Sequence, residues 1–108
     1  GISPELPTLE DINNLNRFED PKREGALCDI LWSDPINEDD VHKLDDSEYR
    51  EFLQMEYISN QARQCSLMFG YKAISRFLKE NNLIYMLRAH EVQEEGFRSH
   101  FVNPDSIG

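Results

Sequence analysis

The sequence is short of cysteine, glycine and basic residues, and each shortage excludes a class of protein. Its 108 residues include two cysteines, five glycines, and 11 Lys plus Arg against 21 Asp plus Glu, for a formal charge of −10. Cys28 and Cys65 resemble neither a disulfide framework nor a CxxC metal site, so we expect two free thiols. The longest basic run is Lys22-Arg23, which argues against nucleic acid or an anionic membrane surface as a partner.

Long apolar runs are missing as well. No stretch approaches the roughly 20 apolar residues that cross a bilayer, and no charged-then-apolar signal segment opens the chain. We therefore expect a soluble, cytoplasmic protein. No glycine stands between Gly25 and Gly70, where ten of the 21 acidic residues lie, and an EF-hand loop needs glycine at its sixth position. The acidic stretch is therefore interpreted as a solvated surface and not as a calcium loop.

The remaining composition fits one small domain or part of one. Hydrophobic residues make up 39% of the chain, which is enough for a core, while 30% of the residues are charged. An average domain is about one quarter charged, so the chain is more polar than a typical complete domain. The chain opens on Gly1, and both ends have the character of interior sequence. We expect it to be a piece of something larger.

Apolar residues at helical spacing predict three helices. The first is short, begins at Thr8, which can cap it, and ends before Pro21. The second covers residues 47–57 with Asp45 or Asp46 as its N-cap. The third covers residues 71–82 and is the clearest, with Asn81-Asn82 as a C-terminal stop.

Shorter apolar runs predict the other elements. Residues 26–32 are expected to form a short buried segment followed by a turn at 33–35, because a proline disfavours helical geometry in the residue before it. Residues 83–87 are five consecutive apolar residues and predict a buried strand. A second strand is expected over residues 97–102. Mixed helices and strands indicate an α/β protein.

Three histidines are candidates for chemistry. His90 follows the expected strand 83–87, where a neutral imidazole could bind zinc or iron, although a hydrogen-bonded structural histidine is the commoner outcome. His42 lies in the acidic stretch and His100 on the second expected strand, so both are expected at the surface. Position alone leaves the role of His90 open.

Three other residues could form a binding site. Arg63 stands at the start of an apolar segment, where a guanidinium can hold two oxygens of one phosphate or can pair with a local carboxylate. Trp32 and Asp34 offer an aromatic wall beside a carboxylate, or a core tryptophan with a turn-capping aspartate. No catalytic triad spacing and no glycine-rich phosphate loop occurs, so the residues alone do not establish an enzyme.

A longer motif narrows these alternatives. Residues 25–35, Gly-Ala-Leu-Cys-Asp-Ile-Leu-Trp-Ser-Asp-Pro, closely resemble the G-x-x-C-D-[LI]-L-W-S-D-P motif of the PPP family of serine/threonine protein phosphatases. Residues 1–5 resemble the end of the family's H-G-G-[IL]-S-P-E motif, residues 60–66 its N-x-x-R-G-x-S segment, and residues 87–91 its L-R-A-H-E segment. The matches occur in the family's order and cover essentially the whole chain.

Further segments resemble one branch of that family. Residues 9–12, 17–21 and 77–83 are most similar to calcineurin catalytic subunits, while residues 80–96 are also similar to the tetratricopeptide-containing branch. The resemblance implies part of a metallophosphoesterase-type β-sandwich flanked by helices. It also implies phosphoprotein substrates, and a calcium-binding regulatory subunit and calmodulin as partners bound through regions outside this chain.

The family resemblance assigns roles residue by residue. It implies hydrolysis by water activated between two metal ions, described as iron with zinc or manganese, while arginines hold the phosphate. His90 matches a metal-ligating histidine and Arg63 the phosphate-clamping arginine. Trp32 and Asp34 match residues that line the substrate site.

The sequence also departs from the family pattern. Gln64 stands where the family usually has glycine, and the acidic stretch at about 36–58 is longer than the usual connection, so we interpret it as a surface insertion. The G-D-x-H-G, G-D-x-V-D-R-G and G-N-H-E motifs, which supply the other ligands, are absent. We expect residues 1–108 to be the C-terminal portion of such a catalytic domain, inactive alone. The alternative is a non-catalytic fragment or pseudophosphatase that acts as an interaction module.

Overall fold

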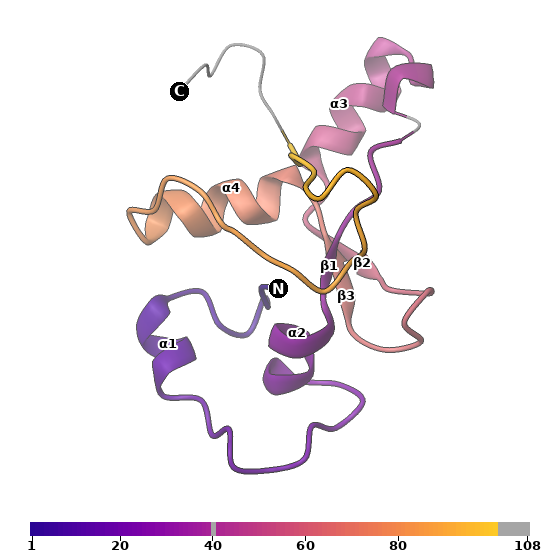
Figure 1. Ribbon diagram of the computed structural model, residues 1–108. Coiled ribbons are helices and arrows are strands. Elements are labelled where there is room, and N and C mark those ends of the chain that lie inside the picture. The colour runs from indigo at the N-terminus through magenta and orange to yellow at the C-terminus, as the bar shows by residue number, and fades with distance from the viewer. Residues whose placement is uncertain (40, 102–108) are drawn as a thin grey trace.

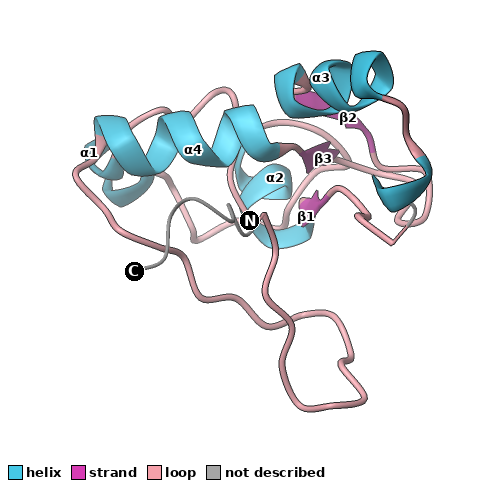
Figure 2. Ribbon diagram, turned by 90° about the horizontal axis from the view of Figure 1, so that it is seen from above, coloured by secondary structure: helices cyan, strands magenta, loops and turns pink. Residues whose placement is uncertain are grey.

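The computed structural model describes residues 1–39 and 41–101 as a mixed α/β arrangement (Figure 1). Short strands are surrounded by helices and long loops (Figure 2). In chain order the elements are α1 (Leu9–Asn13), α2 (Ala26–Trp32), β1 (Asp34–Pro35), the 3-10 helix η1 (Val41–Lys43), α3 (Asp46–Gln54), β2 (Tyr57–Ser59), β3 (Leu67–Phe69) and α4 (Tyr71–Glu80). The α/β class expected from the sequence is confirmed.

The three strands form one sheet in the order β1-β3-β2. β1 runs parallel to β3, with Asp34 opposite Met68, and β2 runs antiparallel to β3, with Ile58 also opposite Met68. Asp34 therefore lies on an edge strand whose neighbour is the central strand. This position brings its carboxylate to the end of the sheet at which the loop between β2 and β3 begins.

The three predicted helices are present, although α3 ends at Gln54 and Tyr57, expected on that helix, lies in β2. The ends of the helices follow from capping chemistry. Thr8 caps α1 and Asp45 caps α3, each through a reciprocal capping box with an acidic residue three positions later. At the end of α4, Asn82 has a φ of 55°, and the N–H of Leu83 donates to the carbonyl of Leu78 at 2.8 Å. This is a Schellman ending, in which asparagine takes the left-handed position that glycine more often fills.

The hydrophobic core joins the N-terminal segment, the central strand and α4. Ile2, Phe69, Ala73 and Ile74 form its buried centre, and flanking side chains such as Phe77 pack against it. These positions on α4 share one face at helical spacing, which is why the sequence pattern located this helix. Within the described residues, no helix is long and apolar enough to cross a membrane.

The two strands expected near the C-terminus are wrong. Residues 83–87 form no strand, and Ile84 and Leu87 are exposed to 87% and 86%. Residues 97–101 form none either; the backbone N–H of Phe101 donates to the carboxylate of Glu38 instead of to another strand. Residue 102 lies outside the described residues. A strand needs a hydrogen-bonding neighbour, and no strand in the described ranges runs beside either segment.

The expected buried segment at 26–32 is the helix α2, and it is buried on one side only. Cys28 and Asp29 are buried, whereas Leu31 and Trp32 are partly exposed. The acidic stretch contains η1 and α3, and Phe52 is the buried residue of α3. That residues 36–58 are an insertion relative to the family stays a prediction.

Candidate phosphate site

The carboxylate of Asp34 is the centre of a buried polar cluster. Asp34 is 3% exposed. The Nε–H of Arg63 donates to its Oδ2 at 3.0 Å, the amide of Asn60 donates to the same oxygen at 2.9 Å, and Arg88 donates to Oδ1 at 2.9 Å. Both oxygens of this buried carboxylate are therefore bound by donors, two of them cations.

Electrostatics stabilise the charged form of this aspartate. Burial alone would raise the pKa of Asp34, but the hydrogen bonds from Arg63 and Asn60 and the charges of Arg63 and Arg88 outweigh it and lower the pKa. The hydrogen bond to Asp34 in turn raises the pKa of Arg63. The pair is therefore ionised at neutral pH, with the Arg63 guanidinium held in one orientation.

Two aromatic rings lie beside the guanidinium. The Cζ of Arg63 lies 5.9 Å from the centroid of the Trp32 ring, and the Trp32 and His90 rings meet edge to face at 5.4 Å. Nη2 of Arg63 also lies 3.5 Å from the carbonyl oxygen of His90. Trp32 is 37% exposed, so it borders the cluster and is not the core tryptophan of the alternative interpretation.

His90 has an unusual backbone. Its φ is 87°, a left-handed conformation that a non-glycine residue rarely adopts. Strained residues of this kind cluster at functional sites, where surrounding contacts hold them. His90 is exposed, and its ring contacts Trp32 at the edge of the cluster.

The structure therefore brings the four sequence-predicted residues together. Trp32 ends α2, Asp34 lies on β1, Arg63 lies in the loop between β2 and β3, and His90 lies in the segment after α4 that returns past the sheet (Figure 1). Arg63 partners a carboxylate, as one alternative held, but that carboxylate is Asp34 of the motif 25–35. Because Asp34 takes the Nε side, the two terminal nitrogens of Arg63 make only the 3.5 Å contact within the described residues.

Sequence reasoning assigned no role to Asn60 or Arg88. Asn60 both donates to Asp34 and accepts the backbone N–H of Arg63 at 3.3 Å, while Arg88 bridges Asp34 and Glu91. Both lie inside the matched segments 60–66 and 87–91. Their position in these motifs was the available signal, but the spacing does not say which carboxylate they bind.

The other two histidines lie outside the cluster. His42 is exposed, as expected. His100, expected at the surface, is partly buried, and its Nδ1 lies 3.5 Å from Oε2 of Glu38. Both cysteines are free, as expected.

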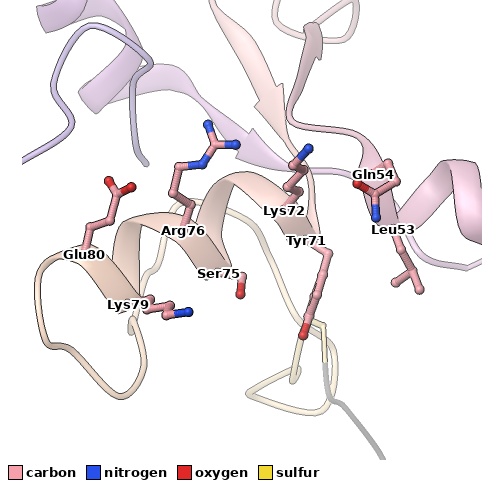
Figure 3. A pocket seen from close by; sticks show the side chains of 8 residues that line it. All are labelled: Leu53, Gln54, Tyr71, Lys72, Ser75, Arg76, Lys79 and Glu80. Atoms are coloured by element: carbon pink, nitrogen blue, oxygen red, sulfur yellow. The ribbon is translucent and has the colours of Figure 1, made fainter.

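A separate hollow lies between α3 and α4, and Figure 3 shows the side chains around it. They are Leu53, Gln54, Tyr71, Lys72, Ser75, Arg76, Lys79 and Glu80. Arg76 pairs with Glu56 at one side of this region. None of the four sequence-predicted site residues lines this hollow, so it is distinct from the Asp34 cluster.

The donor set of the cluster does not make a metal centre by itself. His90 is its one imidazole, and the carboxylates of Asp34 and Glu91 are both bound by Arg88. Across residues 1–39 and 41–101, no three or more histidine, cysteine or acidic side chains are grouped so as to hold a metal ion. The cluster therefore balances two arginines against two carboxylates, and the terminal nitrogens of Arg63 are its donors that are not bound to a carboxylate.

Comparison with known proteins places this arrangement in a family. A family model, the calcineurin-like phosphoesterase model, matches residues 1–94. The chain belongs to the calcineurin-like phosphoesterase family. This confirms the motif-based recognition of a metallophosphoesterase fold.

Individual relatives agree with it. Serine/threonine-protein phosphatase 2B catalytic subunit A1 of Saccharomyces cerevisiae is 46% identical over 99 residues, covering 91% of this chain and 17% of that protein. Subunit A2 of the same yeast is 38% identical over 123 residues, covering all of this chain and 20% of that protein. The yeast serine/threonine-protein phosphatase 4 catalytic subunit is 32% identical over 101 residues, covering 94% of this chain and 27% of that protein. The chain thus spans about a sixth to a quarter of the length of these relatives.

Proposed function

We propose that this chain is the C-terminal portion of the catalytic domain of a protein serine/threonine phosphatase of the calcineurin branch. The substrate would be phosphoserine or phosphothreonine in proteins. The convergence of Trp32, Asp34, Arg63 and His90 carries the proposal, because three separate matched segments supply them to one cluster. Similarity to yeast 2B catalytic subunits supports the branch.

Arg63 is proposed to clamp the phosphate. Its guanidinium is held on the Nε side by Asp34, and planar donors of this kind can bind two oxygens of one phosphate. A phosphoryl group gains negative charge on its oxygens as it is transferred, and preorganised cationic donors stabilise that charge. Arg63 therefore needs a fixed orientation, which the Asp34 carboxylate supports.

Trp32 and Asp34 line the site in different ways. Trp32 provides a flat apolar wall beside Arg63 and His90, which limits where a phosphorylated side chain can lie. Asp34 is bound by its donors on both oxygens, so it acts on the substrate through Arg63. Its negative charge would otherwise repel a phosphate, and the two arginines offset it.

His90 is proposed to contribute one imidazole ligand to a centre of two metal ions, iron with zinc or manganese. Such a centre supplies an activated water for attack on phosphorus. The remaining ligands would come from regions outside this chain, since the described residues hold no ligand cluster of their own. The edge-to-face contact with Trp32 supports this role, because it places the His90 ring beside the phosphate clamp.

The partners follow from the same branch assignment. Because two relatives are named as catalytic subunits, we propose a calcium-binding regulatory subunit and calmodulin as partners, bound through regions outside residues 1–108. A cytoplasmic location is part of the proposal, supported by two unpaired cysteines. Neither nucleic acid nor membrane insertion is proposed.

Hydrolysis of p-nitrophenyl phosphate by the whole protein with manganese tests the catalytic role of this site. His90→Ala and Arg63→Ala are each expected to lower kcat/KM by roughly 10²-fold or more, because each removes a contact to the metals or to the transferred phosphoryl group. Undiminished turnover in His90→Ala would contradict the ligand role. A wild-type protein without turnover under these conditions would favour a pseudophosphatase that acts as an interaction module.

A further inference from the structure

The loop that carries Arg63 is attached at both ends to the segment containing α2 and β1. At its start, the side chain of Asn60 donates to Asp34. At its end, the hydroxyl of Ser66 donates to Oδ1 of Asp29 at 2.7 Å. The backbone N–H of Asn60 also donates to the carbonyl of Ser66 at 3.2 Å, which closes the loop.

This loop contains backbone strain that needs a restraint. Gln64 and Ser66 have φ angles of 57° and 60°, in the left-handed region that disfavours residues with a Cβ. Strained conformations persist only where surrounding contacts determine them. Gln64 is held by its backbone N–H to Gln61 at 3.3 Å, while Ser66 adds a side-chain bond to a buried acceptor.

The acceptor of that bond is itself fixed. Asp29 is 4% exposed and lies within α2, the helix that ends at Trp32. Its other oxygen accepts the hydroxyl of Ser3 at 2.6 Å. Ser66 is thereby tied to the same rigid helix that presents Trp32, independently of the Asp34 cluster.

We propose that Ser66 is a positioning residue for the phosphate clamp: its hydroxyl, by donating to Asp29, fixes the end of the loop so that Arg63 faces the phosphate. The inference rests on the proposed clamp role of Arg63. The Asn60 anchor is bound to the same carboxylate as Arg63, so it moves with the clamp. Strands β2 and β3 hold the backbone at the two ends of the loop, and among its side-chain bonds the Ser66 anchor is the one that ties it to a point other than Asp34.

A small displacement is enough to matter. Catalytic groups act only when their atoms are correctly placed, and a shift of about 1 Å can reduce a rate by roughly 10²-fold. A variant that lacks the Ser66 hydroxyl still has Arg63 and Asp34, and these two side chains can still form their ion pair. The expected effect is therefore smaller than that of deleting Arg63, about tenfold in kcat/KM.

The test is a double-mutant cycle on the whole protein, with p-nitrophenyl phosphate and manganese. It compares Ser66→Gly, Arg63→Ala and the double variant, because glycine removes the hydroxyl but accepts a φ of 60° without strain. Ser66→Gly is expected to lower kcat/KM about tenfold in the wild-type background and less than about twofold beside Arg63→Ala, because coupled residues are non-additive.

Gln64→Gly is the matched control. It relieves the same kind of backbone strain in the same loop and leaves the Ser66 anchor in place, so its kcat/KM should stay within about twofold of wild type. Ser66→Ala, which removes only the hydroxyl oxygen, should show the same non-additivity as Ser66→Gly, and circular dichroism checks that each variant is folded.

Two results would overturn the inference while leaving the clamp intact. One is wild-type activity in both folded Ser66 variants. The other is an equal loss from Ser66→Gly with and without Arg63, which is the behaviour of a residue that serves stability alone. Wild-type activity of Arg63→Ala would instead contradict the proposed function itself, and the positioning role would fall with it.

Discussion

Two buried aspartates on one segment, Asp29 and Asp34, are stabilised by different kinds of hydrogen-bond donor. Asp29, within α2, is 4% exposed and accepts two hydroxyls, from Ser3 and Ser66. Asp34, on β1, is 3% exposed and accepts two guanidinium groups and an amide. The two carboxylates are thus about equally buried, but Asp29 has neutral partners whereas Asp34 has mainly cationic ones.

The difference separates a structural junction from a charged site. A hydroxyl can both donate and accept, so the partners of Asp29 can adapt to another side chain of the same shape. An arginine can only donate, so the partners of Asp34 need an acceptor. Asp34 also orients the one residue proposed to touch phosphate. We therefore expect the same substitution to affect the two aspartates very differently.

Of the substitutions considered, Asp34→Asn should lower the free energy of unfolding most. The amide keeps one acceptor oxygen, but its NH₂ group faces a guanidinium donor in place of the other oxygen, and the negative charge shared by Arg63 and Arg88 is lost. The free energy of unfolding should fall by about 2 kcal/mol, less than for a fully buried pair because both arginines are partly exposed. Urea unfolding of the whole protein measures this, and an unchanged midpoint would contradict it.

Low pH should reduce the difference in unfolding free energy between wild type and Asp34→Asn. The pKa of Asp34 is lowered in the folded state, so its contribution is fully present above the unfolded pKa of about 3.9 and is lost as pH falls through the lower folded value. The gap in unfolding free energy between wild type and Asp34→Asn should therefore narrow below about pH 4. Urea titrations from pH 7 to pH 3 check this; a gap that widens in acid would refute it.

Asp29→Asn should cost much less than Asp34→Asn. The amide oxygen can still accept one hydroxyl, and the other hydroxyl can rotate to accept from the amide hydrogen. We expect a loss below about 1 kcal/mol in the same unfolding experiment, the range of one exchanged neutral hydrogen bond. A loss equal to that of Asp34→Asn would remove the distinction between the two sites.

Gln64→Gly should have the smallest effect and the opposite sign. Gln64 has a φ of 57°, so glycine relieves strain, and a gain of up to about 1 kcal/mol is expected once its greater unfolded-state freedom is included. Gln61→Gly in the same turn is the control, since Gln61 has no positive φ and the change should give no gain. Thermal unfolding of both variants gives the comparison, and a gain at position 61 alone would contradict it.

The elements predicted from the sequence are those whose signals are local. Thr8 and Asp45 each stand three positions before an acidic residue, which is the capping-box spacing. Asn81-Asn82 end α4, so these helix ends could be predicted from the sequence. Residues 83–87 carry an equally clear apolar run, but a strand depends on a partner elsewhere in the chain. That information is not contained in the run itself.

The site was predicted only in part, for the same reason. Motif resemblance selected Trp32, Asp34, Arg63 and His90, and these residues do meet. The pairing of Arg63 with Asp34, and the roles of Asn60 and Arg88, depend on how β1, the loop after β2 and the segment after α4 are brought together. Spacing along the chain cannot specify contacts between segments so distant in sequence.

The central claim is that the guanidinium held by Asp34 binds the transferred phosphate. The most direct measurement is kcat/KM for p-nitrophenyl phosphate in the whole protein, comparing Arg63→Ala with Arg76→Ala, which removes another carboxylate-paired arginine, on α4. We expect a loss of roughly 10²-fold or more at position 63 and wild-type activity at position 76. Equal activities in the two variants would contradict it.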